Sequence, residues 1–182
     1  MTKILTIGHT GFLGSYLYNR FDTHAWPGRF EWQGAWWKWA ASTGNIDTIF
    51  YCARACRKES PRRDRETVIL DTKGIMKTCH AFPDARIFYC STKVVDGWTN
   101  DWVRPISKEE IGNYFERALN NEFVNQTIHL PEISDAQLRK FPPKEELFVE
   151  HLHYARSKII GENIVKSCAK DYTIFRIWDI IP

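Results

Sequence analysis

The sequence has no apolar run long enough to cross a bilayer, and its net charge at neutral pH is only +3. A charge this small does not indicate a general polyanion binder, so we expect neither a membrane nor a nucleic acid as a partner. Only Met1, Thr2 and Lys3 precede the first strand-like run, which is too little for a targeting segment. We therefore expect a cytoplasmic protein.

Cysteine is sparse, and its placement follows no metal-ligand or disulfide pattern. The 5 cysteines are an odd number, and they are scattered at positions 52, 56, 79, 90 and 168. Most of them fall inside apolar segments. We expect reduced, buried thiols and no metal centre.

Aromatic residues are abundant, at 14% of the chain, and 8 of them are tryptophans. With 182 residues the chain is long enough for one domain with a core and short for two, so we expect residues 1–182 to form a single domain. Four tryptophans fall within Trp32–Ala41. This segment is either a short helix at the sheet edge or an aromatic contact surface for a partner or an adenine ring.

The first motif is KILTIGHTGFLG at Lys3–Gly14, an apolar strand-like run that ends in three glycines spaced by three. Gly8 would allow a sharp turn, Gly11 would allow close approach of a pyrophosphate, and Gly14 would allow tight packing of a helix over 15–21. The phosphates would then meet free N–H groups at the helix N-terminus. The candidate cofactor-binding residues of this turn are Gly8, Thr10, Gly11, Phe12, Leu13 and Gly14.

Further strand-like runs alternate with helical patterns along the chain. Buried strands are expected at 46–53, 85–91 and 172–181, and helices at 67–81 and from 144 to about 170. This alternation predicts the α/β class, with a doubly wound parallel sheet of the Rossmann type.

Cofactor preference is open at the sequence level. Arg29 and Glu31 both fall where a dinucleotide site carries either a basic residue for a 2′-phosphate or an acidic one for the ribose, so NAD and NADP remain alternatives. Cys52, Ala53 and Arg54 follow the 46–53 strand and begin a basic segment that reaches Arg65. They are candidate cofactor contacts, because open α/β sheets bind ligands at the carboxyl ends of their strands.

The segment from Trp98 to Pro143 has few strand-like runs. It contains expected helices at Lys108–Asn120 and Asp135–Phe141, opened by Ser107 and Ser134. We expect residues 98–143 to form a helical insertion that caps the site.

Tyr154 and Lys158 stand four residues apart, on one face of the expected 144–170 helix. A phenol has a usual pKa of about 10 and needs help to transfer a proton near pH 7, which an ammonium one turn away supplies. Lys158 can also hold the nicotinamide ribose. Ser91 and Thr92, at the end of the 85–91 strand, are the candidate hydroxyls for the substrate oxygen, and Ser91 is also a candidate cofactor contact.

These motifs resemble those of the extended short-chain dehydrogenase/reductase superfamily, in its NAD-dependent epimerase/dehydratase branch. GHTGFLG is similar to the glycine fingerprint, IFYCSTKVVDG to the strand that carries the catalytic hydroxyl, and HYARSKIIGENIV to the Tyr-x-x-x-Lys helix. The resemblance implies that Thr92, Tyr154 and Lys158 are catalytic, with Tyr154 as acid/base. It also implies NAD or NADP as cofactor and hydride transfer on a nucleotide-linked sugar.

The chain departs from the family pattern in length. Members usually continue for about another hundred residues, as a domain that holds the sugar nucleotide, and the segment between Gly97 and Tyr154 is longer here than usual. Two hypotheses therefore stand: an NAD(P)-dependent oxidoreductase or epimerase, and a catalytically silent dinucleotide-binding or interaction module. Under either hypothesis, apolar surface that the chain does not cover itself would be buried between copies, so we expect a homodimer or another oligomer.

Overall fold

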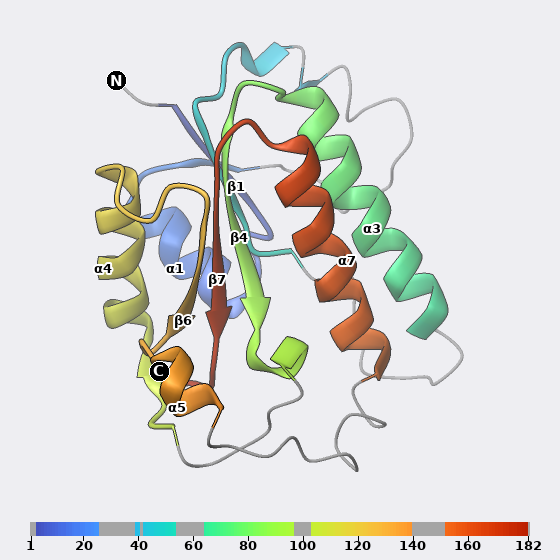
Figure 1. Ribbon diagram of the computed structural model, residues 1–182. Coiled ribbons are helices and arrows are strands. Elements are labelled where there is room, and N and C mark those ends of the chain that lie inside the picture. Colours follow the sequence, from blue (N-terminus) through green and yellow to red (C-terminus); the bar gives the residue numbers. More distant parts are fainter. Residues whose placement is uncertain are drawn as a thin grey trace.

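The structure is a computed structural model that describes residues 3–25, 39–40, 42–53, 64–96, 103–139 and 152–181. Its central layer is a six-stranded sheet in the order β2-β1-β3-β4-β7-β6, in which every pairing is parallel (Figure 1). The strands are β1 (Ile4–Ile7), β2 (His24–Ala25), β3 (Thr48–Tyr51), β4 (Arg86–Thr92), β6 (Gln126–Leu130) and β7 (Tyr172–Ile177). The doubly wound parallel sheet predicted from the sequence is confirmed.

The central strands are rich in apolar residues and largely buried because helices cover both faces of the sheet. Every residue of β3 is buried, as is every residue of β4 after Arg86. The expected strands at 46–53, 85–91 and 172–181 correspond to β3, β4 and β7, which are shorter than the apolar runs or shifted by one residue. The last run also supplies β8 (Ile180–Ile181), which pairs with β5 (Ile106–Ser107) in a separate two-stranded sheet.

Two pairs of helices sandwich the sheet (Figure 1). One face carries α3 (Asp64–Ala81) and α7 (Leu152–Cys168), and the other carries α1 (Phe12–Arg20) and α4 (Lys108–Leu119). A group of fully buried phenylalanines packs under α4, with the Phe115 and Phe175 ring centroids 4.6 Å apart. Helix α1 begins at Phe12, three residues before the predicted start, because Gly11 already serves as its N-cap.

Helix α4 begins at a complete capping box. The Ser107 side chain accepts a hydrogen bond from the backbone N–H of Glu110, and the Glu110 carboxylate accepts one from the backbone N–H of Ser107. The Arg104 guanidinium and the Ser107 contacts hold the pKa of Glu110 down, to about 2. The predicted helix start at Ser107 is therefore confirmed.

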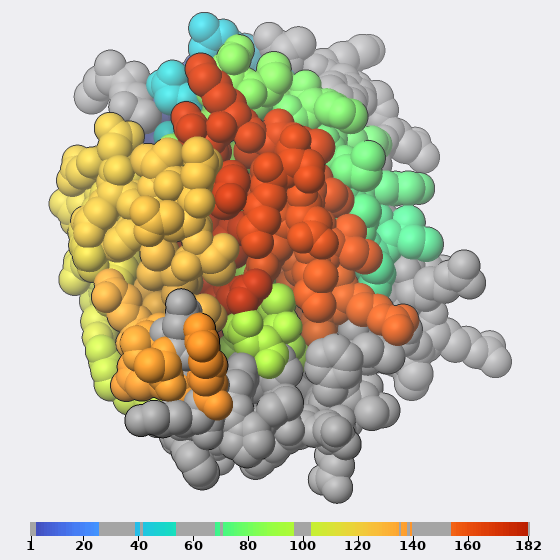
Figure 2. Space-filling view, in the orientation of Figure 1, coloured from blue at the N-terminus to red at the C-terminus, as the bar shows by residue number. Residues whose placement is uncertain are grey.

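Residues 98–143 are not the helical insertion that we expected. Their described part, 103–139, contains the edge strand β6 in addition to α4 and the one-turn helix α5 (Asp135–Leu138). Strand β6 pairs with β7 from Gln126↔Thr173 to Leu130↔Ile177, and this segment lies against the C-terminal one in Figure 2. Within the described residues β6 pairs with β7 alone and places Ile128 and Leu130 under α4, so it is an edge strand of the main sheet. The cap over the site stays a prediction.

Several other predictions fall partly or wholly outside the described residues. They include residues 32–38 and 41 of the tryptophan-rich segment, the basic segment up to position 63, and the first residues of the 144–170 helix, which is described from Leu152 onward. Among the described cysteines, Cys52, Cys79, Cys90 and Cys168 are free thiols. In the part of the chain that the structure describes, no helix combines the length and the apolar character needed to span a membrane.

Candidate functional site

The carboxyl ends of β1 and β3 form the point at which the sheet changes direction. Strand β1 lies between β2 and β3, so the chain leaves it toward one side and returns on the other. Such a switch point opens a crevice at the carboxyl ends of the two strands, where open α/β sheets bind ligands. The glycine turn and residues Cys52 and Ala53 meet at this point, as the sequence predicted.

Gly8 brings the two strand ends into contact. Its φ of +90° lies in the region that favours glycine, and a Cβ built on it would lie 2.7 Å from the Ala53 backbone nitrogen. The backbone N–H of Cys52 donates to the Ile7 carbonyl at 2.8 Å. Any side chain at position 8 would therefore push β3 away from the turn.

Gly14 and Gly11 differ in how much space surrounds them. A Cβ on Gly14 would lie 2.1 Å from the Gly8 carbonyl oxygen, so Gly14 allows α1 to pack on the turn. A Cβ on Gly11 would meet only that same oxygen, at 3.3 Å. Helix α1, which the structure describes in full, has no side-chain cap and no acidic residue in its first turn. Its first N–H groups are thus left for an anion, as in dinucleotide-binding turns.

The remaining predicted residues of this turn contribute in different ways. Leu13 is buried in the core beneath α1, so only its backbone can face a ligand. Thr10 is exposed, and Phe12 exposes 52% of its surface. Arg29 and Arg54 lie outside the described residues, so their predicted roles remain predictions.

Lys158 reaches from α7 to the end of β4. It is buried, its Nζ donates to the Cys90 carbonyl oxygen at 3.0 Å, and it lies 5.0 Å from the centroid of the Tyr89 ring. Burial by itself lowers the pKa of Lys158, but Tyr89, Tyr154 and Asp71 raise it, and the net shift is upward. The side chain therefore stays an ammonium at neutral pH.

Tyr154 and Thr92 lie at the same end of the sheet as Lys158. Tyr154 is half-buried one turn before Lys158 on α7, so the two side chains share a helix face. Thr92 is buried and closes β4, two residues after the carbonyl that Lys158 contacts. The structure thus brings the Tyr-x-x-x-Lys helix to the strand that carries the candidate hydroxyl.

A row of polar residues crosses three neighbouring strands one step before their ends. Ser91, Arg176 and His129 are register partners on β4, β7 and β6, and two carboxylates bridge them. The Glu162 carboxylate accepts from Ser91 Oγ at 2.5 Å and from Arg176 Nη2 at 2.7 Å. Asp96 accepts from Arg176 and lies 3.1 Å from His129 Nε2. We call these five residues the polar row.

The polar row holds the end of β4, which carries Thr92, against α7 and β7. Glu162 is 2% exposed and Asp96 belongs to the 3-10 helix η2 (Lys93–Asp96), so the row also fixes the turn that follows Thr92. The Ser91 hydroxyl donates a hydrogen bond to Glu162. A ligand contact by this predicted cofactor residue would therefore have to use the hydroxyl oxygen as acceptor, or the backbone. Glu162, Arg176 and His129 were not predicted as site residues from the sequence. A signal was present, because an arginine inside the buried run YTIFRI needs a partner.

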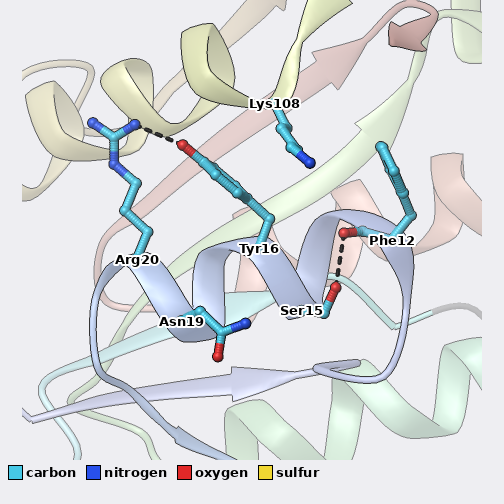
Figure 3. A pocket seen from close by; sticks show the side chains of 6 residues that line it. All are labelled: Phe12, Ser15, Tyr16, Asn19, Arg20 and Lys108. Atoms are coloured by element: carbon cyan, nitrogen blue, oxygen red, sulfur yellow. Dashed lines mark hydrogen bonds between the residues drawn. The ribbon is translucent and has the colours of Figure 1, made fainter. Parts of the chain in front are cut away.

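A hollow of about 450 Å³ lies between α1 and the start of α4 (Figure 3). Its lining residues come from these two helices: Phe12, Ser15, Tyr16, Asn19, Arg20 and Lys108. Arg20 Nη2 donates to Asn113 Oδ1 at 2.7 Å, and Lys108 Nζ lies 5.7 Å from the Phe12 ring centroid. These contacts join the two helices, so we assign the hollow to helix packing and not to the site.

Comparison with known proteins agrees with this geometry. The model of an NAD-binding family, described as male sterility protein, matches residues 37–181. No curated protein matches the chain in sequence.

Solved structures share the fold at low sequence identity. A short-chain dehydrogenase/reductase superfamily protein from Agrobacterium tumefaciens with bound NAD is 13% identical, with a TM-score of 0.56 over 96% of this chain and 48% of that one. A putative epimerase from Burkholderia cenocepacia is 13% identical, with a TM-score of 0.58 over 97% and 54%. The UDP-Glc/GlcNAc 4-epimerase from Campylobacter jejuni is 14% identical, with a TM-score of 0.53 over 92% and 49%. The chain thus spans about half the length of these proteins.

Proposed function

The chain belongs to the male sterility protein family of NAD-binding domains, and from that premise we propose that it binds NAD or NADP as part of an oxidoreductase or epimerase. This membership confirms the resemblance to the short-chain dehydrogenase/reductase superfamily seen in the motifs. The single observation that carries the proposal is the switch point between β1 and β3, where Gly8 and Gly14 let the turn, the end of β3 and the start of α1 pack against one another at distances that no Cβ would allow.

The residues around the crevice fit a dinucleotide. Gly11, Phe12 and Leu13 would present backbone N–H groups to the pyrophosphate at the uncapped start of α1. Cys52 and Ala53 would lie beside it, because they meet the glycine turn directly. Bound NAD or NADP would supply the hydride chemistry, which no side chain of this protein provides.

The side chains would supply the proton step. Lys158 keeps its positive charge in a buried position one helical turn from Tyr154, so a proton transfer by the Tyr154 hydroxyl would take place beside an ammonium. Thr92 would hydrogen-bond the substrate oxygen from the end of β4, and the polar row would hold that strand end in place. We propose these three residues as catalytic, with Tyr154 as acid/base.

We propose a nucleotide-linked sugar as the substrate, in keeping with the resemblance of the three motifs to the epimerase/dehydratase branch. The Campylobacter jejuni structure of this fold is a UDP-Glc/GlcNAc 4-epimerase, which makes UDP-linked sugars the first compounds to test. The alternative is a dinucleotide-binding module without turnover.

We also propose that the chain forms a homodimer or another oligomer. Helices α3 and α7 carry three large apolar side chains with more than a third of their surface exposed: Ile69, Met76 and Ile160. Apolar side chains gathered on two adjacent helices support a protein contact on this face. The oligomeric state by light scattering at micromolar concentration tests this proposal, and a monomer would contradict it.

Gly11→Val should weaken NAD and NADP binding by roughly tenfold or more while the protein stays folded. The new side chain would fill space at the start of α1, and among the described residues its Cβ would approach the Gly8 oxygen at 3.3 Å, whereas a Cβ at position 8 or 14 would strike backbone. Titration calorimetry with each dinucleotide measures the affinity, and urea unfolding checks the fold.

Gly44→Asn is the matched control for this experiment. Gly44 has a φ of +71°, which asparagine tolerates, and a Cβ there would meet only Lys3 Nζ at 3.8 Å. Gly44 precedes β3 at the amino end of the sheet, so the dinucleotide affinity of the Gly44→Asn protein should equal that of the wild type. Wild-type affinity in folded Gly11→Val would contradict the proposed site.

A further inference from the structure

Two thiols lie side by side at the carboxyl ends of β3 and β4. Cys52 Sγ is 3.2 Å from Cys90 Sγ, and the two residues come from strands 38 positions apart in the sequence. We propose that Cys52 and Cys90 form a site of oxidative modification, a dithiol that closes into an intramolecular disulfide when it reacts with a disulfide such as oxidised glutathione. This inference does not depend on the proposed function.

The strand register allows the bond to form without moving the backbone. Tyr51 pairs with Tyr89, so Cys52 and Cys90 stand opposite each other one residue further on. Both side chains face the core cluster under α1 and α4. Neighbouring strands are about 4.8 Å apart, and the Cα atoms of a disulfide are about 4.4 to 6.8 Å apart. Rotation of the two side chains is then enough to bring the sulfurs together.

The two thiols differ in their access to a reagent. Cys90 is 7% exposed, whereas Cys52 is only partly buried and follows the last residue of β3. Of these two thiols, Cys52 is therefore the one that an oxidant in solution reaches first. Among the thiols that the structure describes, Cys90 lies against Cys52 and would supply the second nucleophile.

The reaction proceeds by two thiol–disulfide exchanges. The Cys52 thiolate attacks one sulfur of oxidised glutathione, forms a mixed disulfide and releases one glutathione. The Cys90 thiolate then attacks Cys52 Sγ and releases the second glutathione, which closes the Cys52–Cys90 bond. The two protein thiols lose two protons and two electrons, which one molecule of oxidised glutathione takes up as it becomes two molecules of reduced glutathione.

The rate of closure should rise with pH from neutral into the alkaline range. The hydrogen bond with Cys90 and burial raise the pKa of Cys52 well above its usual value, and the Lys158 ammonium on α7 opposes that shift. The side of the pair under α1 and α4 is apolar, formed by Leu13, Phe50 and Phe88. Only the thiolate attacks. As long as the pH lies below the pKa of Cys52, the fraction of Cys52 present as thiolate, and with it the rate of closure, should therefore rise about tenfold for each unit by which the pH is raised.

The position of the pair connects it to the site. A Cβ on Gly8 would lie 2.8 Å from the backbone carbon of Cys52, and the carbonyl of Cys90 accepts the hydrogen bond from Lys158. The disulfide would therefore fasten β3 to β4 between the glycine turn and the Lys158 ammonium.

Peptide mapping tests the proposal directly, because trypsin places each of the five cysteines on its own peptide. The folded full chain is treated with oxidised glutathione at pH 8.5, its remaining thiols are alkylated, and the digest is analysed by mass spectrometry without reduction. We expect a cross-linked species of peptides 39–54 and 87–93, and the count of free thiols should fall by two at this pair.

Two variants complete the test. Cys52→Ser and Cys90→Ser should each abolish the cross-linked species and leave the other thiol free or joined to glutathione. Cys79→Ser is the matched control, since Cys79 is buried on the opposite face of the sheet, and it should not change the yield. A Cys52 that stays joined to glutathione, pairs with Cys56, or remains free after oxidation of the wild type would overturn the proposal.

Discussion

Glu162→Gln should destabilise the protein by about 3 to 5 kcal/mol, the usual cost of removing one partner from a buried ion pair. The Glu162 carboxylate is almost fully buried and accepts from Ser91 Oγ and from two nitrogens of Arg176. An amide at this position would turn an N–H₂ group toward the guanidinium or the hydroxyl, and Arg176 would lose one of the two carboxylates, Glu162 and Asp96, that compensate its charge. Urea unfolding with an unchanged m-value would measure the loss.

The same substitution on the surface provides the control. Glu116 pairs with Arg20 Nη2 at 3.0 Å, but its side chain is 61% exposed, so Glu116→Gln should cost less than about 1 kcal/mol. If Glu162→Gln costs no more than this control, the polar row does not hold the strand ends together.

Tyr154→Phe should lower turnover by about 100 to 10,000-fold, which is the usual contribution of a positioned proton-transfer group. The substitution removes only the hydroxyl, so the half-buried ring keeps its packing on α7. Incubation of the NAD-loaded protein with UDP-glucose and UDP-N-acetylglucosamine measures the reaction, by product analysis and by the near-ultraviolet absorbance of reduced nicotinamide. Dinucleotide affinity should change far less than in Gly11→Val.

Tyr172→Phe makes the same chemical change at the opposite end of the sheet. Tyr172 begins β7, whereas the site lies at the carboxyl ends, so this variant should keep the wild-type rate. A Tyr154→Phe protein that retains more than about a tenth of that rate would show that the phenol is not the acid/base. Binding of dinucleotide without turnover of any nucleotide sugar would favour the module hypothesis.

The central part of the fold could be predicted because its strands are buried on both faces. Runs such as TIFY in β3 and RIFYCST in β4 are apolar almost throughout, and they alternate with helical patterns. Strand β6 was missed because it lies at the sheet edge. Its sequence QTIHL is half polar, and only its pairing with β7 identifies it as a strand.

The residues of the site also differ in whether a local sequence pattern indicates them. The glycine turn and the Tyr154–Lys158 pair are local patterns, so their spacing alone indicated the elements that carry them. The polar row has no local pattern, since Ser91 and Glu162 are 71 positions apart and Asp96 and Arg176 are 80 apart. The same holds for Cys52 and Cys90, whose sulfurs meet only because β3 and β4 pair in register.

The place of β7 in the sheet determines when the sheet can be completed during synthesis on the ribosome. Strand β7 lies between β4 and β6, yet both of these precede it in the sequence. While the ribosome is still adding residues 152–171, β4 and β6 have emerged or are emerging without the strand that separates them. The sheet can close only after β7 has left the ribosome, and until then two strand edges are open to wrong pairing. A chaperone that covers these edges during synthesis should therefore raise the yield of folded protein.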